Sequence, residues 1–348
     1  MFSGIGGFEL GIQRAFNKQF TEIQQDGQRW NRDINQVEHN VLPTSRSTPL
    51  CVGYSEIDKY AIKVYERNFN GHKNYGDCTA IDAQQLPDFD LLVGGFPCQA
   101  FSIAGKRAGF DDTRGTLFFD IARILKEKQP RHLVLENVKG LLSHDGGRTF
   151  TTIIGVLSDL GYFVEWQVLN SKDFGVPQNR ERVIIVGHLG NECGRKVFPI
   201  VGNTGKNLKQ LIGGSQGNRV YATDGISSTI ASQAGGLGAK TGLYAMRGRE
   251  NGQQLEKSGD YTNTITSVTK DNLWVENARI RRLTPLECER LQGFPDNWTA
   301  LDQDGQPISD TQRYKMCGNA VTTNVIQAVI SKLFAITKSD TQEKEVEV

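Results

Sequence analysis

The sequence predicts an α/β fold, in which a doubly wound, mostly parallel sheet is joined to a smaller β-rich lobe. Short apolar runs that start at Asp90, His132 and Arg182 have the length of buried strands. Between them, apolar residues recur at helical spacing over 58–69 and 117–125. Strands that alternate with helices indicate a parallel sheet with helices on both faces. Such folds bind ligands at the carboxyl ends of their strands.

The chain changes character near residue 190. Beyond this point glycine becomes frequent, helical spacing disappears, and short pieces rich in Thr, Ser and Tyr alternate with turn residues. Helical spacing resumes over 284–292 and again over 321–333. We therefore predict an α/β domain, a β-rich lobe, a segment that returns to the first domain, and a charged, disordered tail. Their boundaries are 1–190, 191–280, 281–337 and 338–348.

Composition is that of a soluble protein. At 348 residues the chain exceeds one ordinary domain, so two lobes are expected. It is 38% hydrophobic and 23% charged, and no apolar run approaches the roughly 18 residues that span a membrane. The start has no pattern of a secretion signal, and the six cysteines show no zinc-ligand spacing. We expect a cytoplasmic protein with reduced thiols, no metal and no membrane partner.

Positive charge is concentrated in one stretch of a chain whose net charge is only +1. From Arg195 to Arg282 the sequence holds thirteen Lys and Arg residues against six Asp and Glu, a balance of +7. The remainder is correspondingly acidic. A polyanion such as a nucleic acid should therefore meet the protein along this stretch.

Glycines and acids near the N-terminus suit a nucleotide-like ligand. The turn from Phe2 to Phe8 precedes a helical pattern, and its glycines allow a ligand to approach backbone amides. Glu56 could accept hydrogen bonds from a ribose, and Asp77 could hold an adenine amino group. Each feature also has a plainer interpretation, because tight turns need glycines and helix N-caps prefer acids.

Cys98 directly follows the first predicted strand. A free cysteine is commonly a small buried hydrophobe, but Pro97 and the two glycines before it favour an accessible thiol at the ligand-binding edge. Glu136 ends the next strand at the same edge. Arg180 and Arg182 alternate where a third strand begins, so both could point to one face. The alternative for these three charged residues is simple exposure to solvent.

Together these motifs resemble the cytosine-C5 DNA methyltransferases of bacterial restriction-modification systems. They occur in the family's order and span nearly the whole chain. The segments that carry the resemblance are Phe2 to Gly7, Glu56, Gly76-Asp77, Pro97-Cys98-Gln99, Glu136-Asn137-Val138, Gln178 to Arg182, Arg282 to Pro295 and Gly318 to Val321. The resemblance implies the Rossmann-like fold of S-adenosylmethionine-dependent methyltransferases.

The activity that this resemblance implies is that of a DNA (cytosine-5-)-methyltransferase. A methyl group would pass from S-adenosylmethionine to C5 of a flipped cytosine in a specific duplex sequence, leaving S-adenosylhomocysteine. Cys98 would add to C6 as the nucleophile. Glu136 would carry a proton for N3, which burial favours. Arg182, supported by Arg180, would contact the base carbonyl. The base that removes the C5 proton is not identified by the sequence.

Binding residues also follow from the resemblance. The cofactor would be bound by Phe2, Gly4, Gly6, Gly7, Glu56, Ile57, Asp77, Cys78, Pro97, Leu117, Asn319 and Val321. DNA would be bound by Gln99, Ser102, Arg114, Gln216, Arg219, Thr229, Gln233, Gly235 and Gly236.

Within the DNA set, Gln216 would fill the space left by the flipped base, Arg219 would contact a guanine edge, and Thr229 would lie behind the cytosine. Glycines and basic residues over 105–115 are typical of a mobile lid. The 191–280 lobe would then be a target-recognition domain. We expect a monomer that acts on double-stranded DNA and is associated with the nucleoid because it binds DNA. A cognate restriction endonuclease that acts on the same DNA sequence is a possible partner.

One departure from the family pattern concerns the N-terminus. Family members normally have a few apolar strand residues before the first glycine motif, whereas here only Met1 and Phe2 precede Ser3. The first strand is expected to be missing or truncated: either this start is not the natural one, or the strand is shortened and cofactor affinity is lower as a result.

Three other functions were weighed. A transfer-RNA cytosine methyltransferase would use the same catalytic motifs but would need little base-reading surface, in contrast to the long basic lobe. A non-catalytic DNA-binding homologue would lack the nucleophile or the acid, yet Cys98 and Glu136 are both present. A nucleotide-dependent oxidoreductase would explain the glycine turn but not the Pro97-Cys98 pair.

Overall fold

The computed structural model describes residues 1–18, 49–97, 117–190, 196–202 and 283–335. Between 203 and 282 it describes the backbone of a set of short strands. Cys98 and the segment that follows it up to residue 116 lie outside the described residues.

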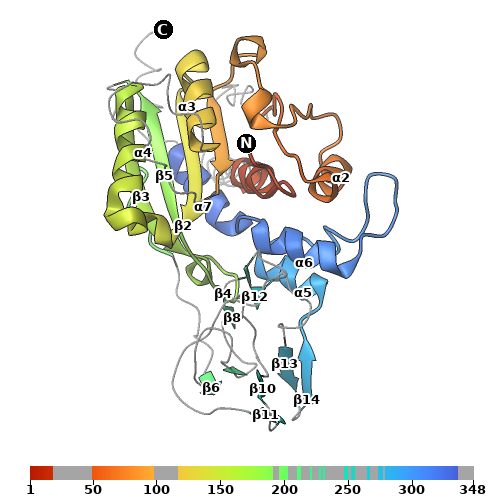
Figure 1. Ribbon diagram of the computed structural model, residues 1–348. Helices are drawn as coiled ribbons and strands as arrows, with labels where there is room; N and C mark the ends of the chain where they lie inside the picture. Colours follow the sequence, from red (N-terminus) through yellow and green to blue (C-terminus); the bar gives the residue numbers. More distant parts are fainter. Residues whose placement is uncertain are drawn as a thin grey trace, which may run out of the picture.

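A four-stranded sheet forms the centre of the molecule (Figure 1). Its strands lie in the order β1 (Leu91–Gly95), β2 (His132–Val138), β5 (Glu181–Leu189) and β3 (Tyr162–Asn170). β1 and β2 are parallel, whereas β5 is antiparallel to both β2 and β3. The predicted α/β class is confirmed, but among the described strands this sheet is mixed rather than mostly parallel. Only ten residues separate β3 from β5, too few for the crossover helix that a parallel pair needs.

Helices account for most of the remaining described residues. Residues 7–18 are helical. The labelled helices are α2 (Lys59–Asn68), α3 (Leu117–Lys128), α4 (Arg148–Asp159), α5 (Pro285–Leu291), α6 (Asp310–Asn319) and α7 (Thr323–Leu333). Short 3₁₀ turns are η1 (Cys78–Ala80), η2 (Ala83–Gln85), η4 (Lys139–Leu142), η5 (His144–Gly147) and η6 (Ser171–Asp173). No helix in these ranges is long and apolar enough to cross a membrane.

Local sequence signals explain where two of these helices begin. Asp58 caps α2, because its carboxylate accepts hydrogen bonds from Tyr60 N and Ala61 N. Thr284 and Glu287 form a reciprocal capping box at α5, and Pro285 occupies the first helical position, where no N–H is needed. The starts of both helices therefore agree with the predicted helical segments.

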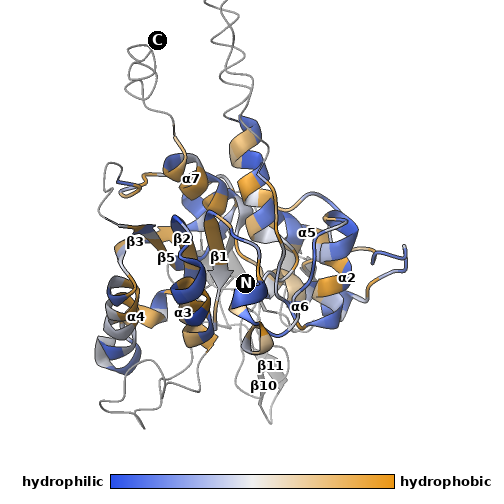
Figure 2. Ribbon diagram, turned by 90° about the horizontal axis from the view of Figure 1, so that it is seen from above, coloured by the Kyte–Doolittle hydropathy of each residue, from blue (hydrophilic) through white to orange (hydrophobic). Residues whose placement is uncertain are grey.

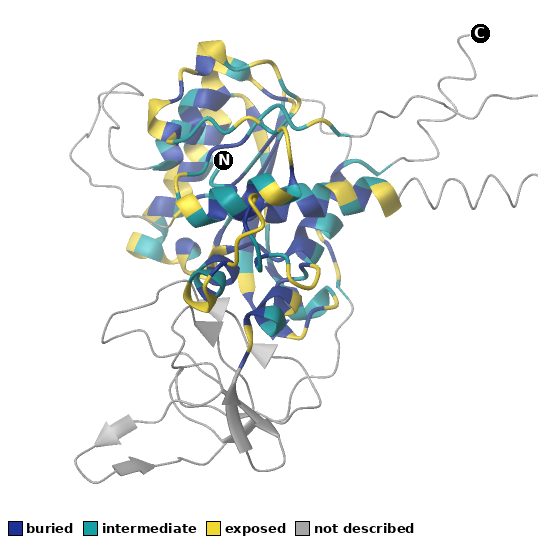
Figure 3. Ribbon diagram, turned by 90° about the vertical axis from the view of Figure 1, so that its right-hand side faces the viewer, coloured by how far each residue is buried: buried dark blue, intermediate teal, exposed yellow. Residues whose placement is uncertain are grey.

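The two faces of the sheet are covered by different helices (Figure 2). Leu133 and Leu135 of β2 point into a core shared with α3 and α4. Val134, which lies between them, points to the other face and packs with α7 and helix 7–18. This alternation follows from the period-two geometry of a strand. The C-terminal segment thus packs on the α/β domain, and the buried residues concentrate along the sheet (Figure 3).

Short strands follow the sheet in the chain, as the glycine-rich texture predicts. They are β6 (Gln210–Ile212), β7 (Val220–Tyr221), β8 (Ser227–Ser228), β9 (Ile230–Ala231), β10 (Arg247–Arg249), β11 (Gly252–Gln254), β12 (Ile265–Thr266), β13 (Leu273–Glu276) and β14 (Arg279–Arg282). β8 pairs with β4 (Gln178–Asn179), which lies between β3 and β5 in the chain. β9 and β12 contact α6. Some of these short strands therefore contact elements beside the sheet.

Helix 7–18 approaches α7 closely because it has glycines one turn apart on the facing side. A Cβ on Gly7 would lie 2.8 Å from Val321 Cγ2, and one on Gly11 would lie 2.7 Å from Ile326 Cβ. The second of these would also lie 3.0 Å from Thr323 O. A side chain at Gly11 would push the two helices apart, and one at Gly7 would collide with Val321, just before α7.

We expect Gly11→Ala to lower the free energy of unfolding by about 1–3 kcal/mol, because overpacking outweighs the better helix propensity of alanine. Gly155→Ala is the matched control, since Gly155 lies in α4, is exposed, and has open space at its Cβ position. That variant should gain about 0.5–1 kcal/mol. Thermal and denaturant unfolding would measure both. Equal stabilisation of the two variants would contradict the close approach.

Candidate active site

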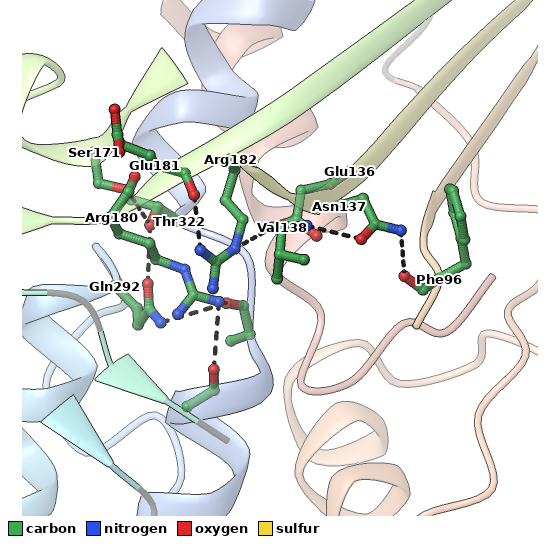
Figure 4. Close-up of polar contacts among 12 residues, drawn as sticks. Phe96, Glu136, Asn137, Val138, Ser171, Arg180, Glu181, Arg182, Gln292 and Thr322 are labelled. Atoms are coloured by element: carbon green, nitrogen blue, oxygen red, sulfur yellow. Dashed lines mark hydrogen bonds and ion pairs between the residues drawn. The ribbon is translucent and has the colours of Figure 1, made fainter. Parts of the chain in front are cut away.

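An ion pair between an acid and an arginine lies at one edge of the sheet (Figure 4). Arg182 Nε lies 3.0 Å from Glu136 Oε1, and the side chains are 18% and 12% exposed. Burial lowers the pKa of Arg182, while the nearby Glu136 carboxylate opposes that shift. Arg182 Nη1 also donates a hydrogen bond to Glu181 O over 2.8 Å. The pair is thus held in a largely desolvated position, where charge interactions are strong.

Strand register explains why these residues meet. Gly95 at the end of β1 lies beside Glu136, and Val138 at the end of β2 lies beside Arg182 at the start of β5. Because β5 is antiparallel, its beginning falls at the edge where β1 and β2 end. The chain leaves β1 at this edge and leads through Phe96 and Pro97 to Cys98.

Arg180 is buried near this ion pair. Its side chain is 3% exposed and its Nη2 donates to Ala320 O over 3.0 Å and to Gly318 O over 3.3 Å. Arg182 thus pairs with Glu136, whereas Arg180 bonds to main-chain carbonyls at the end of α6. Arg180 lies between β4 and β5 in the chain, and its guanidinium contacts the turn after α6.

Asn137 joins the two strand ends at the site. Its Nδ2 donates to Phe96 O over 2.9 Å, and its Oδ1 accepts from Val138 N over 2.8 Å. The side chain is buried, and Phe96 lies two residues before Cys98. Asn137 therefore fixes the start of the Pro97-Cys98 segment relative to Glu136, a role that the sequence analysis did not assign.

The glycine turn is organised by Glu56. Its Oε2 accepts a hydrogen bond from Gly4 N over 2.8 Å, and its Oε1 accepts from Ile57 N and Asp58 N, both over 2.9 Å. Gly4 has φ +53°, and a Cβ there would meet nothing within 4 Å. Gly6 has φ +82°, and a Cβ there would overlap the ring of Phe69. Gly4 therefore borders open space, while Gly6 packs tightly.

The neighbouring residues predicted to hold the cofactor differ in exposure. Ile57 is 71% exposed. Asp77 accepts from Thr79 N and Oγ1, so its carboxylate caps η1. Cys78 is buried, and its carbonyl accepts a 2.9 Å hydrogen bond from Arg123 Nη2. The exposed Ile57 side chain is therefore available to a ligand, whereas the Cys78 side chain faces the core.

Residues from the far end of the chain complete this edge. Val321 is buried, and its methyl groups would contact a Cβ on Gly7 at 2.8 Å and one on Gly95 at 3.8 Å. The same hypothetical Cβ on Gly95 would lie 3.4 Å from Glu136 Oε2. Four segments that are distant in sequence thus lie close together at this edge of the sheet. They contain Gly7, Gly95, Glu136 and Val321.

Three other residues predicted to bind the cofactor have described positions. Asn319 is exposed at the end of α6, Pro97 is exposed after β1, and Leu117 is half-buried as the first residue of α3. Phe2 has φ +54°, an uncommon conformation for a residue with a side chain.

The remaining predicted site residues lie outside the described residues. They are Cys98, Gln99, Ser102, Arg114, Gln216, Arg219, Thr229, Gln233, Gly235 and Gly236. The described cysteines are Cys51, Cys78, Cys288 and Cys317. Burial raises the pKa of each of these four thiols, to about 11 for Cys78. They are poorly suited to act as thiolate nucleophiles.

The chain is similar in sequence to proteins of one known family. The C-5 cytosine-specific DNA methylase family matches residues 1–335. The Type II methyltransferase M.NlaX of Neisseria lactamica is 36% identical over 345 residues, which are 96% of this chain and 95% of that protein. M1.ScrFI of Lactococcus lactis subsp. cremoris is 43% identical over 288 residues, 81% of this chain and 71% of the relative.

The fold is also similar to that of a methyltransferase of known structure. The methyltransferase EhMeth of Entamoeba histolytica matches with a TM-score of 0.59 at 16% identity and covers 96% of both chains. The fold is therefore that of the α/β methyltransferases. The chain belongs to the C-5 cytosine-specific DNA methylase family and is a DNA cytosine-5-methyltransferase. The family resemblance of its motifs is confirmed, while the roles of individual residues stay predictions.

We expect Asn137→Ala to reduce the rate constant of methyl transfer about tenfold to a hundredfold, because a small displacement of a reacting group has effects of this order. Asn68→Ala is the control, since Asn68 Nδ2 also donates to main-chain carbonyls, Val64 O and Trp298 O. Single-turnover transfer of labelled methyl groups to DNA would measure both. If the two variants were equally active, the positioning role of Asn137 would be wrong.

Proposed function

We propose that the enzyme methylates C5 of a cytosine in a specific duplex DNA sequence, using S-adenosylmethionine and a transient bond between Cys98 and C6. The observation that supports this most strongly is the Glu136–Arg182 pair at the end of β2, beside the strand that leads to Cys98. The family supports cytosine-C5 methylation itself; the cofactor, the covalent step and the residue roles are part of the proposal.

The reaction needs covalent activation because C5 of cytosine is a poor nucleophile. The Cys98 thiolate adds its electron pair to C6, and a proton from Glu136 reaches N3, so that the ring becomes an enamine. C5 would then bond to the methyl group while the carbon–sulfur bond of the sulfonium breaks, which leaves S-adenosylhomocysteine. Loss of the C5 proton to a base, departure of the Cys98 thiolate and return of the N3 proton to Glu136 restore the neutral aromatic ring.

Glu136 and Arg182 are assigned to different atoms of the cytosine base. Arg182 faces Glu136 Oε1, while Oε2 lies on the Gly95 side. Oε2 is therefore the oxygen that we assign to N3 of the cytosine, and Glu136 carries its proton when the base is bound. The guanidinium of Arg182 is placed to contact the base carbonyl. Arg180 supports this indirectly by holding the turn after α6.

The residues around the glycine turn fit S-adenosylmethionine. When bound, this cofactor supplies an electrophilic methyl group on a sulfonium. The open space at Gly4 gives room for a ligand next to the Glu56 carboxylate, and ribose hydroxyls are suitable donors to that carboxylate. The exposed Ile57 side chain offers an apolar surface to the adenine. Val321, which contacts Gly7, closes the opposite side.

A duplex cytosine has to leave the base stack to reach this site, at a cost of a few kcal/mol. We assign the opening and reading of the DNA to segment 191–280, with Gln216, Arg219 and Thr229 in the roles that the family resemblance implies. The names of the Type II relatives support a place in a restriction-modification system, with a cognate endonuclease for the same sequence. Arg219 favours a guanine next to the target cytosine.

Cys98→Ala should abolish transfer of labelled methyl to unmethylated duplex DNA and should keep affinity for S-adenosylmethionine, because only the nucleophile is removed. Cys51→Ala, which changes a described thiol in the N-terminal lobe, should keep its activity. Calorimetry would measure cofactor binding, and sequencing of modified cytosines would identify the recognition sequence. Full activity of Cys98→Ala would refute the covalent mechanism. Transfer to transfer RNA in preference to duplex DNA would refute the assigned substrate.

A further inference from the structure

A buried polar junction lies behind the active site, where β4 meets the end of α5. Gln178 in β4 and Gln292 at the C-cap of α5 are both 0% exposed. Gln178 Nε2 donates to Leu291 O over 2.6 Å and to Gln292 Oε1 over 3.2 Å. Buried amides of this kind are costly unless they are hydrogen-bonded, so the two side chains stabilise one defined arrangement.

Gln292 also reaches the turn that follows α6. Its Nε2 donates to Cys317 O over 2.8 Å and to Ala320 O over 3.3 Å. Ala320 O is the carbonyl that accepts from Arg180 as well. Thr322, at the start of α7, donates its hydroxyl to Gln292 Oε1 over 2.9 Å and bonds to Ser171 Oγ over 2.8 Å. Figure 4 shows Arg180, Gln292 and Thr322 converging beside the Glu136–Arg182 pair.

The junction connects the elements that hold the two substrates of the proposed reaction. β4 leads to Arg182 and pairs with β8, which lies in the segment 191–280 that we assign to DNA reading. The turn after α6 carries Asn319 and Val321, which we assign to the cofactor, and α6 itself contacts β9 and β12. Among the described residues, Gln292 is hydrogen-bonded to both sides of the junction, and its side chain makes no hydrogen bond to Glu136 or to the glycine turn.

We propose that Gln292 is a positioning residue, which sets the distance between the base-binding strand and the cofactor-binding turn. This rests on the proposed function. Each substrate binds mainly to its own side of the junction, so loss of the junction leaves each binary affinity nearly intact. Methyl transfer, in contrast, requires C5 and the methyl group to face each other closely, and it is sensitive to a shift of about 1 Å.

Two variants test this role. Thr322→Val keeps the shape of the side chain and removes one hydroxyl from the junction, and Gln292→Met removes the amide. Thr299→Val is the matched control. Thr299 is also 0% exposed in the C-terminal segment, and its hydroxyl bonds to Glu289 and to Arg313, away from β4. The free energy of unfolding should be measured for each variant. We expect Thr322→Val and Thr299→Val to lower it by similar amounts.

The decisive measurement is single-turnover methyl transfer to unmethylated phage genomic DNA, with affinities for S-adenosylhomocysteine and for the DNA measured separately. We expect Thr322→Val to lose about tenfold and Gln292→Met about a hundredfold in the transfer rate constant, with both affinities within about threefold of the wild type. The folded fraction of Thr299→Val should transfer at the wild-type rate.

Each other outcome has a defined meaning. A wild-type enzyme that transfers no methyl group to DNA overturns the proposed function and this role with it. An active wild type together with an unchanged transfer rate in Thr322→Val and Gln292→Met overturns the positioning role alone. Equal losses of rate in Thr322→Val and Thr299→Val, or losses confined to the affinities, also overturn it, because they indicate general destabilisation or a direct binding contribution.

Discussion

The Glu136–Arg182 ion pair depends on how the strands at this edge of the sheet are arranged. Removing two charged groups from water is costly, and their attraction compensates only when the partners are held close together. That requires the end of β2 and the start of β5 to lie side by side, which the antiparallel insertion of β5 provides. Arg180, buried nearby, adds a second positive charge; burial and then Arg182 lower its pKa, and Glu136 opposes the shift. The carboxylate of Glu136 thus stabilises both arginines.

Much of the α/β domain could be predicted from the sequence because its elements carry strong local patterns. The apolar run at His132 corresponds to β2, and the helical spacing over 58–69 corresponds to α2 with its Asp58 cap. Helix α7 was also predicted, since its buried residues recur at helical spacing. In each case the residues that define the pattern are those that pack into the core.

Strand direction and the polar junction could not be predicted in the same way. A buried strand has the same apolar run whether it is parallel or antiparallel, so the orientation of β5 depends on the chain that precedes it.

Helices α4 and α6 were not predicted from the sequence. In α6 the helical periodicity is weak, because polar residues occupy much of its length. The sequence motifs contain Asn137, Gln178 and Gln292 but do not reveal their roles. Their hydrogen-bond partners are main-chain carbonyls far away in sequence.

The hydrogen bonds of Glu56 affect how substitutions in this enzyme should be interpreted. Its carboxylate already accepts three backbone amides before any ligand is considered, including that of Gly4. Replacing it with glutamine would turn one of these acceptor positions into a donor that faces an N–H group. Such a change would rearrange the glycine turn even in the absence of cofactor. A loss of affinity at this position therefore combines the cost of rebuilding the protein loop with that of a missing ribose contact, and the two have to be separated by comparing the unliganded structures.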